Sequence, residues 1–402
     1  MIFLDWASTS PPDADILAEA VGVAVAHTGN PSSRHSLGGD AKARLEEARG
    51  RLLEAITTVS PPAAGKQGGR IVFTSGGTEA DGIPLLALIR QALNAKRDGA
   101  IKRLHIVTTE IEHAAIYDQA HLLKSLGFGV TFVAPEADGR VDPRKVGAAV
   151  EKDSALVAVM AVNNETGAIQ DLPGIAQAVA EAAAALGRTP PRFHVDAVQA
   201  LGKLPFDPAA VGAGSAAFSA HKLRGPRGVG ALWIAAPLEP LALGGGQEAA
   251  LRAGTENLQG AWAFAAAAAA ARGSHPQRIA KARELEARLL DGLAAIPGIL
   301  PLPLGRKAGD PRYSPFILSA SFPGLSGEVL VRALSDQGVA VSTGSACSSN
   351  SNRTGRRILK AMGLPEPLAL SAIRISTGDL SSTSDIDAFL EAASTAYRRL
   401  KS

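Results

Sequence analysis

Short apolar, β-branched runs alternate with longer segments of helical periodicity through roughly the first 260 residues. The runs lack a clean alternation of apolar and polar positions, which is typical of strands buried on both faces of a sheet. We predict seven such strands, at 71–74, 104–108, 130–133, 155–162, 193–196, 216–219 and 229–234. Helical patterns accompany them at 36–58, 78–97, 113–126 and 171–187. The pattern predicts an α/β fold with a mainly parallel seven-stranded sheet flanked by helices.

After residue 260 the pattern changes and indicates a smaller α/β domain. We predict helices at 259–272, 275–295, 326–336 and 383–400, and strands at 316–322, 339–343 and 373–376. The expected division is a large domain of residues 16–260 and a small domain formed by 1–15 and 261–402.

Composition narrows the class of protein. The chain has 402 residues, which exceeds one ordinary domain, and 46% hydrophobic with 20% charged residues is typical of a folded protein. A net charge of +3 without a dense Lys/Arg block gives no reason to expect nucleic-acid binding. No apolar stretch reaches the length of a membrane span, and the start, MIFLDWASTSPP, lacks the pattern of a signal peptide. A single cysteine excludes an intramolecular disulfide, so we expect a reducing cytoplasm.

The strongest candidate chemistry lies between residues 193 and 222. Asp196 ends an apolar strand and Gln199 follows it, while Lys222 ends a second run after Ser219 and His221. Lysine forms Schiff bases. A pyridoxal phosphate site needs such a lysine, an acidic partner for the pyridine nitrogen, and hydroxyl or imidazole donors for the phosphate. All occur in this window, which favours a pyridoxal phosphate site over a solvated lysine beside a core histidine.

Further candidates follow other predicted strands. Gly77 and Thr78 belong to a Ser-Gly-Gly-Thr turn that opens a helix, where backbone N–H groups and the helix N-terminus favour an anion. The same turn is also a common helix cap. His113 could lie over an aromatic ring or simply begin a helix.

Amide and guanidinium groups stand at two more strands. Asn163 and Asn164 end the run at 155–162, where they could cap a turn or reach a ligand. Arg374 lies inside an apolar strand and requires a partner, which is either a carboxylate ligand or a structural salt bridge.

Cys347 is the only thiol of the chain and lies outside any apolar run. Its surroundings are rich in Gly, Ser and Asn and are followed by Arg353, Arg356 and Arg357. An accessible thiol near positive charge is typical of a reactive thiolate, so we predict a nucleophile rather than a core cysteine.

Taken together, these segments resemble the cysteine desulfurases, pyridoxal phosphate enzymes of the class-V aminotransferase group with the fold-type I architecture. The resemblance covers nearly the whole chain. Its motifs are LDWASTSPP, GNPSSRHSLG at 29–38, FTSGGTEA, TEIEHAA, VNNETGAIQ, HVDAVQALGK, FSAHKLRGPRGVGAL, GGGQEAALRAGTEN, STGSACSS and IRISTG. The long segment around Cys347 resembles the group that serves general or nitrogenase iron–sulfur cluster assembly.

The resemblance implies a role for each matching residue. Lys222 would bind the cofactor and shuttle protons, Asp196 would keep its pyridine nitrogen protonated, and Gln199 would hydrogen-bond its ring oxygen. His113 would stack on the ring and assist proton transfer, and Asn164 would contact the ring oxygen and the substrate. The phosphate would be held by Gly77, Thr78, Ser219 and His221.

The remaining implied roles concern the substrate and the partners. Arg374 would bind the carboxylate of L-cysteine, and Cys347 would attack its sulfur, release alanine and carry a persulfide to an acceptor protein. Thr255 would reach the phosphate of a neighbouring subunit, which implies a homodimer. No resident metal is expected, and whether an iron–sulfur cluster transiently binds Cys347 stays open.

Two departures and two alternatives accompany this interpretation. The Pro/Gly-rich insert at 60–69 is longer than in the family, and the arginines after Cys347 leave the acceptor open: a cluster scaffold, a nitrogenase-dedicated partner or a tRNA-thiolation relay.

One alternative is a related pyridoxal phosphate lyase or aminotransferase, for instance one acting on selenocysteine. The other is a non-catalytic scaffold that binds sulfur-carrier proteins.

Overall fold

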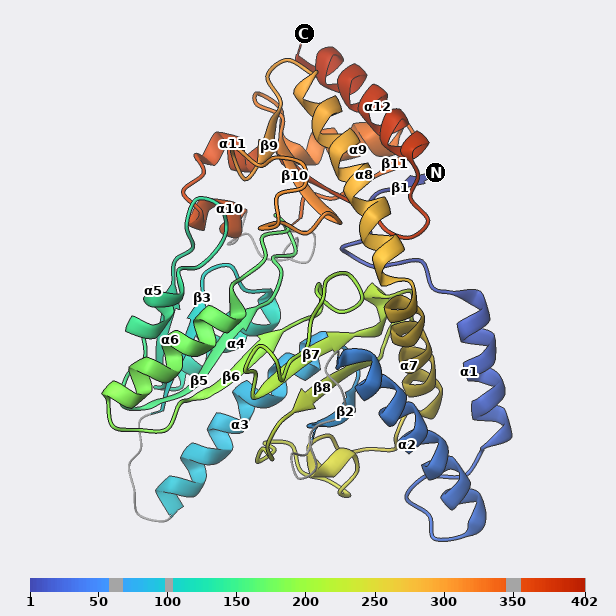
Figure 1. Ribbon diagram of the computed structural model, residues 1–402, viewed down its shortest axis with the longest axis vertical. Coiled ribbons are helices and arrows are strands. Elements are labelled where there is room, and N and C mark those ends of the chain that lie inside the picture. Colours follow the sequence, from blue (N-terminus) through green and yellow to red (C-terminus); the bar gives the residue numbers. More distant parts are fainter. Residues whose placement is uncertain (58–67, 98–103, 345–355, 402) are drawn as a thin grey trace.

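The computed structural model describes residues 1–401 except for 58–67, 98–103 and 345–355. Its centre is a seven-stranded sheet with the order β2-β8-β7-β6-β5-β3-β4 (Figure 1). The strands are β2 (Arg70–Thr74), β3 (His105–Thr109), β4 (Gly129–Val133), β5 (Ser154–Met160), β6 (Arg192–Asp196), β7 (Ser215–Ser219) and β8 (Gly230–Ile234). β3 to β7 pair in parallel, whereas β8 runs antiparallel to β2 and β7. The predicted mainly parallel seven-stranded sheet is confirmed.

Helices cover both faces of this sheet because successive strand residues point to opposite sides. Val107 and Val157 pack into one core with α1 (Ala14–Ala26), α2 (Ser36–Ile56), α5 (Pro143–Ala148), α6 (Leu172–Ala185) and α7 (Leu258–Gly273). Their neighbours Ile106 and Leu156 pack on the other face with α3 (Gly77–Arg97) and α4 (Ala114–Ser125). Strands without alternation therefore belong to a sheet that is buried on both sides.

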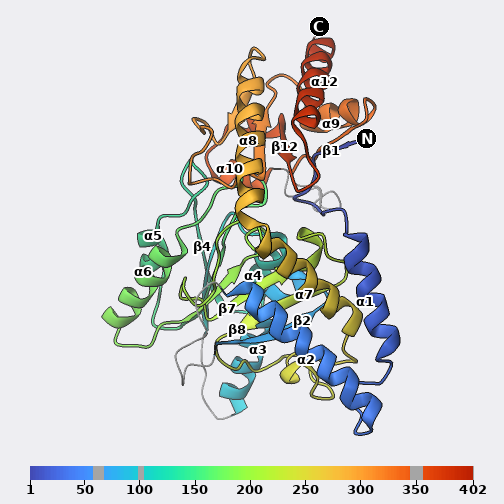
Figure 2. The same cartoon turned by 45° about the vertical axis from the view of Figure 1, so that its right-hand side comes forward.

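The C-terminal part forms a second core around a three-stranded antiparallel sheet, β12-β10-β9. Its strands are β9 (Leu300–Leu302), β10 (Ile317–Ser321) and β12 (Ala372–Ser376). Helices α8 (His275–Ala294), α9 (Gly327–Ser335) and α12 (Thr383–Lys401) pack on it, and α10 (Arg357–Ala361) and α11 (Glu366–Leu370) complete this part. Figure 2 shows α8 leading from α7 beside the large sheet to this second layer.

The N-terminal residues belong spatially to the C-terminal part. β1 (Ile2–Phe3) pairs in parallel with β11 (Val339–Ala340), and Leu4 is buried in the second core. Both chain ends lie at this end of the molecule (Figure 1). The predicted domain boundaries stay a prediction; α7, most of which that prediction assigns to the small domain, packs into the core of the large sheet.

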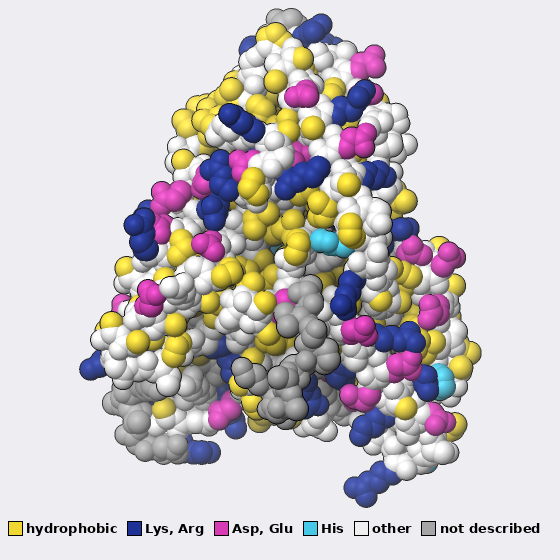
Figure 3. All heavy atoms as spheres, viewed as in Figure 1, with side chains coloured by type: hydrophobic (Ala, Val, Ile, Leu, Met, Phe, Trp, Pro, Cys, Tyr) yellow, Lys and Arg dark blue, Asp and Glu magenta, His cyan; other side chains and the backbone are white. Residues whose placement is uncertain are grey.

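The face of the molecule in Figure 3 carries no patch of a single charge sign. Acidic and basic side chains are interspersed over the face shown in Figure 3. In the part of the chain that the structure describes, no helix is both long and apolar enough to cross a membrane. Cys347, Arg353 and most of the 60–69 insert lie outside the described residues.

Candidate functional site

A cavity of about 370 Å³ opens at the carboxyl ends of β5, β6 and β7, where they face the C-terminal part. Side chains at the carboxyl ends of parallel strands meet at one edge of a sheet, which is where sites in such folds form. The predicted site residues that line the cavity are Gly77, Thr78, His113, Asn164, Asp196, Gln199, Ser219, His221, Lys222 and Arg374. Thr255 is exposed and does not line the cavity. Cys347 is not among the described residues, but Gly344, three positions before it, lines the cavity.

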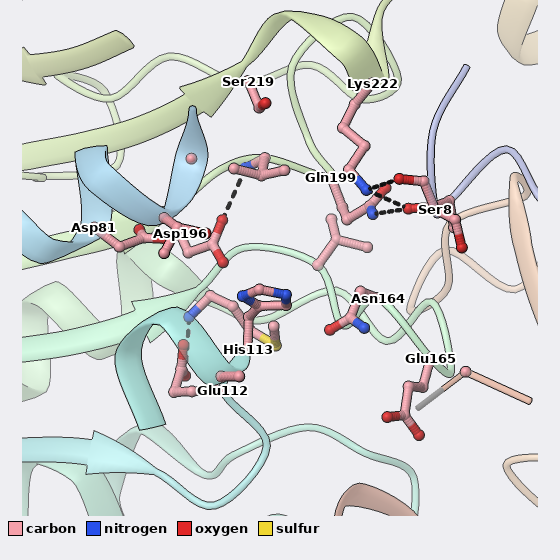
Figure 4. Close-up of a pocket in the computed structure, with 18 of the residues that line it drawn as sticks. Ser8, Asp81, Glu112, His113, Asn164, Glu165, Asp196, Gln199, Ser219 and Lys222 are labelled. Carbon is pink, nitrogen blue, oxygen red and sulfur yellow. Dashed lines mark hydrogen bonds between the residues drawn. The ribbon is translucent and has the colours of Figure 1, made fainter. Parts of the chain in front are cut away.

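Lys222 reaches the cavity from a 3₁₀ turn, Ala220–Lys222, that follows β7 directly. Its Nζ donates to the backbone oxygens of Ala7 at 2.6 Å and Ser8 at 2.5 Å. In Figure 4 the side chains of Lys222 and Gln199 converge on this N-terminal segment. The ammonium group is therefore held by two carbonyl acceptors at the wall of the cavity.

Asp196 is the last residue of β6, and its carboxyl group faces the cavity (Figure 4). Its Oδ1 accepts a hydrogen bond from the backbone N–H of Val198 at 3.0 Å. Burial raises its pKa, while the nearby His113 and Lys222 act in the opposite direction. A cationic group bound in the cavity would favour the ionised form of this carboxyl group.

Two further buried carboxyl groups line the same cavity. Glu112 accepts hydrogen bonds from Thr109 Oγ1 at 2.6 Å and from the backbone N–H of Met160 at 3.0 Å, and burial raises its pKa to about 8. Asp81 lies 3.1 Å from Nε2 of His194, and burial together with Asp196 raises its pKa well above the ordinary value. Glu112 therefore favours the neutral form near neutral pH, and the pKa of Asp81 is shifted in the same direction, which reduces like-charge repulsion around Asp196.

The buried position of Glu112 predicts a pH-dependent stability. Its pKa in the fold, about 8, exceeds the ordinary value of 4.5, so the unfolded chain releases a proton that the folded chain retains between these values. This contribution to stability is present at low pH and is lost as the pH rises toward 8. Glutamine would keep an acceptor oxygen for Thr109 and Met160 without titrating. We expect Glu112→Gln to match the wild-type melting temperature near pH 5 and to exceed it at pH 8 by on the order of 5 °C.

Differential scanning fluorimetry of the cofactor-free protein across this pH range measures the effect. The exposed Glu151→Gln exchange is the matched control and should follow the wild-type curve. Equal pH slopes for wild type and Glu112→Gln would contradict the prediction.

His113 caps the N-terminus of α4 and extends over the cavity (Figure 4). Its Nδ1 accepts the backbone N–H of Ala115 at 3.1 Å, so the proton of the neutral imidazole lies on Nε2. Burial lowers the pKa of His113, which favours this neutral form. A flat, neutral ring with one free N–H thus borders the cavity.

The part of the cavity that is lined by Gly77, Thr78, Ser219 and His221 is suited to an anion. Helix α3 begins at Gly77, and its free N–H groups and dipole favour a negatively charged ligand. A Cβ atom on Gly77 would approach Cγ2 of Val198 to 2.7 Å, so a larger residue would disturb this corner. Ser219 and His221 line the cavity from the end of β7 and the turn after it. Burial and the neighbouring Lys222 lower the pKa of His221 to about 4, so its imidazole is neutral.

Arg374 comes from β12 and spans between the two parts of the chain. Its Nη1 donates to the backbone oxygen of Asn164 at 2.8 Å, and its Nη2 donates to Asp5 Oδ1 at 2.8 Å and Ser8 Oγ at 2.7 Å. The structural salt bridge considered for this arginine is therefore present. The guanidinium also lines the cavity, and its Nε is buried with no hydrogen-bond partner in the described part of the chain.

The two adjacent asparagines have different surroundings. Asn163 accepts the backbone N–H groups of Glu165 and Thr166 at 3.0 and 2.9 Å and so caps the turn. Asn164 lines the cavity, and its Oδ1 is buried without a hydrogen-bond partner among the described residues. An unpaired buried amide oxygen is costly, which indicates that this oxygen faces a ligand.

Sequence reasoning missed several residues of the cavity. Asp81 follows Thr78 by three residues, and Glu112 directly precedes His113. Their closeness to two predicted site residues at helix starts was the signal that could have identified them. Ala7 and Ser8 lie in a segment that a motif covered, but their carbonyl contacts with Lys222 depend on tertiary packing. Arg357, which stacks on Tyr117 with 3.8 Å from Cζ to the ring centroid, also lines the cavity.

The residues present fit pyridoxal phosphate. The cavity brings together the amine of Lys222, the buried carboxyl group of Asp196 and the imidazole of His113. The N-terminus of α3 supplies N–H groups for a phosphate. Among the described residues, no group of three or more His, Cys, Asp or Glu side chains is arranged to hold a metal ion.

Comparisons with known proteins agree with this geometry. Residues 2–389 match the family model described as aminotransferase class-V. The chain is 36% identical over 405 aligned positions to the cysteine desulfurase IscS of Anaeromyxobacter dehalogenans, covering 100% of this chain and 93% of that protein. It is 34% identical to cysteine desulfurase IscS 1 of Archaeoglobus fulgidus, covering 100% and 98%. A solved NifS-like protein superposes with a TM-score of 0.83 at 31% identity, covering 99% of each chain.

Proposed function

Since the chain belongs to the class-V aminotransferase family and to its cysteine desulfurases, we propose that it converts L-cysteine to L-alanine with pyridoxal phosphate. The sulfur atom is transferred to Cys347 and then to an acceptor protein for iron–sulfur cluster assembly and related pathways. The observation that carries the proposal is the convergence of Lys222, Asp196, His113 and the N-terminus of α3 on one cavity.

Different residues of the cavity would bind different parts of pyridoxal phosphate. Lys222 would attach the cofactor, Asp196 would pair with its pyridine nitrogen, and Gln199 would donate to its ring oxygen. The phosphate would be held at the helix N-terminus by Gly77, Thr78, Ser219 and His221, which line the cavity. When bound, pyridoxal phosphate supplies an electron-accepting ring that weakens bonds around the α-carbon of an amino acid.

The chain's own groups position the substrate and move its protons. Arg374 lines the cavity and would bind the substrate carboxylate in exchange for a contact that its Nη2 makes with Asp5 or Ser8. Asn164 would contact the substrate and the ring oxygen of the cofactor, since it lines the cavity and its Oδ1 has no partner among the described residues. Lys222 Nζ and His113 Nε2 carry protons to and from the reacting carbon, and the carbonyls of Ala7 and Ser8 hold the lysine when it is protonated.

Cys347 takes the sulfur atom. Its thiolate attacks the substrate sulfur, so that an S–S bond forms as the C–S bond breaks, and the electron pair left on carbon takes up a proton to give alanine. Gly344, which stands three positions before Cys347 in the sequence, lines the cavity. The proposal includes a protein that accepts the sulfur atom and the cytoplasm as the compartment. It leaves open whether an iron–sulfur cluster transiently binds Cys347.

A homodimer is part of the proposal. Thr255 is exposed and lies outside the cavity of its own chain, which is compatible with a contact to the phosphate site of a second copy. Analytical ultracentrifugation would test the dimer.

The decisive experiment is an absorbance spectrum before and after L-cysteine is added, with alanine and sulfide measured for wild type and Cys347→Ala. We expect a yellow protein whose spectrum changes with cysteine, and at least about a hundredfold loss of alanine formation in the variant. A yellow protein whose variant still forms alanine at the wild-type rate would favour a lyase or aminotransferase. A colourless protein that takes up no pyridoxal phosphate would favour the non-catalytic scaffold.

A further inference from the structure

Lys203 is a buried lysine that stands directly behind the cavity. Its side chain is only 4% exposed and does not line the cavity, and its Nζ donates to Oε1 of Gln199 at 2.6 Å. Nothing in the roles proposed above uses this residue. It lies in the turn after β6, four residues beyond Gln199.

The surroundings make an ammonium group at this position expensive. Burial lowers the pKa of Lys203 well below its ordinary value, and the cations Lys222, Arg278 and Arg374 lower it further, opposed by Asp379. Asp379 itself forms an ion pair with Arg278 at 2.7 Å. An apolar residue of similar length would avoid this desolvation, so fold stability gives no reason for a lysine here.

Lys203 and Ala7 together determine the orientation of the Gln199 amide. Gln199 Oε1 accepts from Lys203, and Gln199 Nε2 donates to the backbone oxygen of Ala7 at 2.9 Å. A flipped amide would place its oxygen against the carbonyl oxygen of Ala7, whatever the protonation state of Lys203, and would turn its NH₂ group toward the N–H donors of Lys203 Nζ. Only one orientation of the amide therefore satisfies both partners.

The same amide lines the cavity, and the same Ala7 oxygen accepts from Lys222. We propose that Lys203 is a positioning residue that fixes the Gln199 amide with its N–H donor toward the cofactor's ring oxygen. This inference rests on the proposed function, because it takes pyridoxal phosphate as the occupant of the cavity. The donor would stabilise negative charge on that oxygen, and a flipped amide would repel it.

A double-mutant cycle tests the proposal with Lys203→Met, Gln199→Met and the combined variant. The readouts are the dissociation constant of pyridoxal phosphate and the pH midpoint of its visible absorbance change when bound. We expect Lys203→Met to weaken cofactor binding about tenfold and to raise the midpoint, since a negatively charged ring oxygen loses its donor. Gln199→Met should do the same, and the combined variant should equal Gln199→Met alone.

The melting temperature of the cofactor-free protein separates positioning from a role in folding. Lys203→Met should melt within a few degrees of wild type, because the removal of a buried amine offsets the loss of the donor to Gln199 Oε1. The exposed Lys42→Met exchange on α2 is the matched control and should leave both readouts unchanged.

Three outcomes would overturn the role of Lys203. One is an unchanged affinity and midpoint in Lys203→Met. Another is an equal effect of Lys203→Met with and without Gln199, which would show that its charge acts directly. The third is a Lys203→Met protein that fails to fold or melts much lower. A wild-type protein that binds no pyridoxal phosphate would instead contradict the proposed function itself.

Discussion

Replacing Lys222 by alanine should reduce turnover of L-cysteine by at least about 10³-fold while pyridoxal phosphate still binds. The variant loses both the amine that attaches the cofactor and the group that moves protons at the reacting carbon. Asp196 and His113 remain in place because each is held by a backbone N–H group, that of Val198 and that of Ala115. The cofactor should therefore be retained without a covalent bond.

The measurement is alanine formation together with mass spectrometry after borohydride reduction, which traps a lysine–cofactor bond. Wild type should gain the mass of the reduced cofactor and the variant should not. Added methylamine should restore part of the activity, since a free amine can enter the vacated space. The exposed Lys152→Ala exchange is the control. A variant that retains wild-type turnover would remove Lys222 from the mechanism.

Replacing Asp196 by asparagine should lower kcat/KM for L-cysteine by about 10²- to 10⁴-fold. The exchange keeps the size of the side chain and an oxygen for the N–H of Val198, so the cavity wall is preserved. It removes the negative charge that would keep a pyridine nitrogen protonated. The cofactor ring would then accept electrons less readily, and its binding should also weaken.

The Asp196→Asn exchange should lower activity without lowering the melting temperature of the cofactor-free protein. Burial raises the pKa of Asp196, so the stability associated with its protonated form is lost as the pH rises through that value. Asparagine does not titrate, and the cofactor-free variant should therefore melt at or above the wild-type temperature at neutral and higher pH. Loss of activity with a lower melting temperature would indicate a damaged fold instead, and unchanged activity would exclude the proposed ion pair.

Much of the fold was predictable because strands buried on both faces leave a clear local signal. The runs around Val107, Val157 and Val195 appear as β3, β5 and β6 within two residues of the predicted ends. Elements with weak local signals were missed, among them β1, β9, α1, α5, α10 and α11. β9 contains Pro301, which has no N–H for a strand ladder and is tolerated at the edge of the three-stranded sheet.

Several site residues were predictable because their chemistry follows directly after a strand or at a helix start. Asp196 ends β6, Lys222 follows β7, and His113 caps α4. Topology brings such positions to one edge of a parallel sheet, so residue type and local position were enough to select them. For Arg374 the sequence left two alternatives, and the structure shows an arginine that both pairs with Asp5 and lines the cavity.

By itself, the sequence determined the α/β architecture and the set of groups suited to pyridoxal phosphate, because periodicity and motif chemistry are local properties. Only the tertiary structure decided which distant groups act on one another. The carbonyls of Ala7 and Ser8 meet Lys222 more than two hundred residues later, and a buried Lys203 orients the amide of Gln199. Burial and proximity set those contacts and the pKa directions of Glu112 and Asp81, and neither quantity exists until the chain has folded.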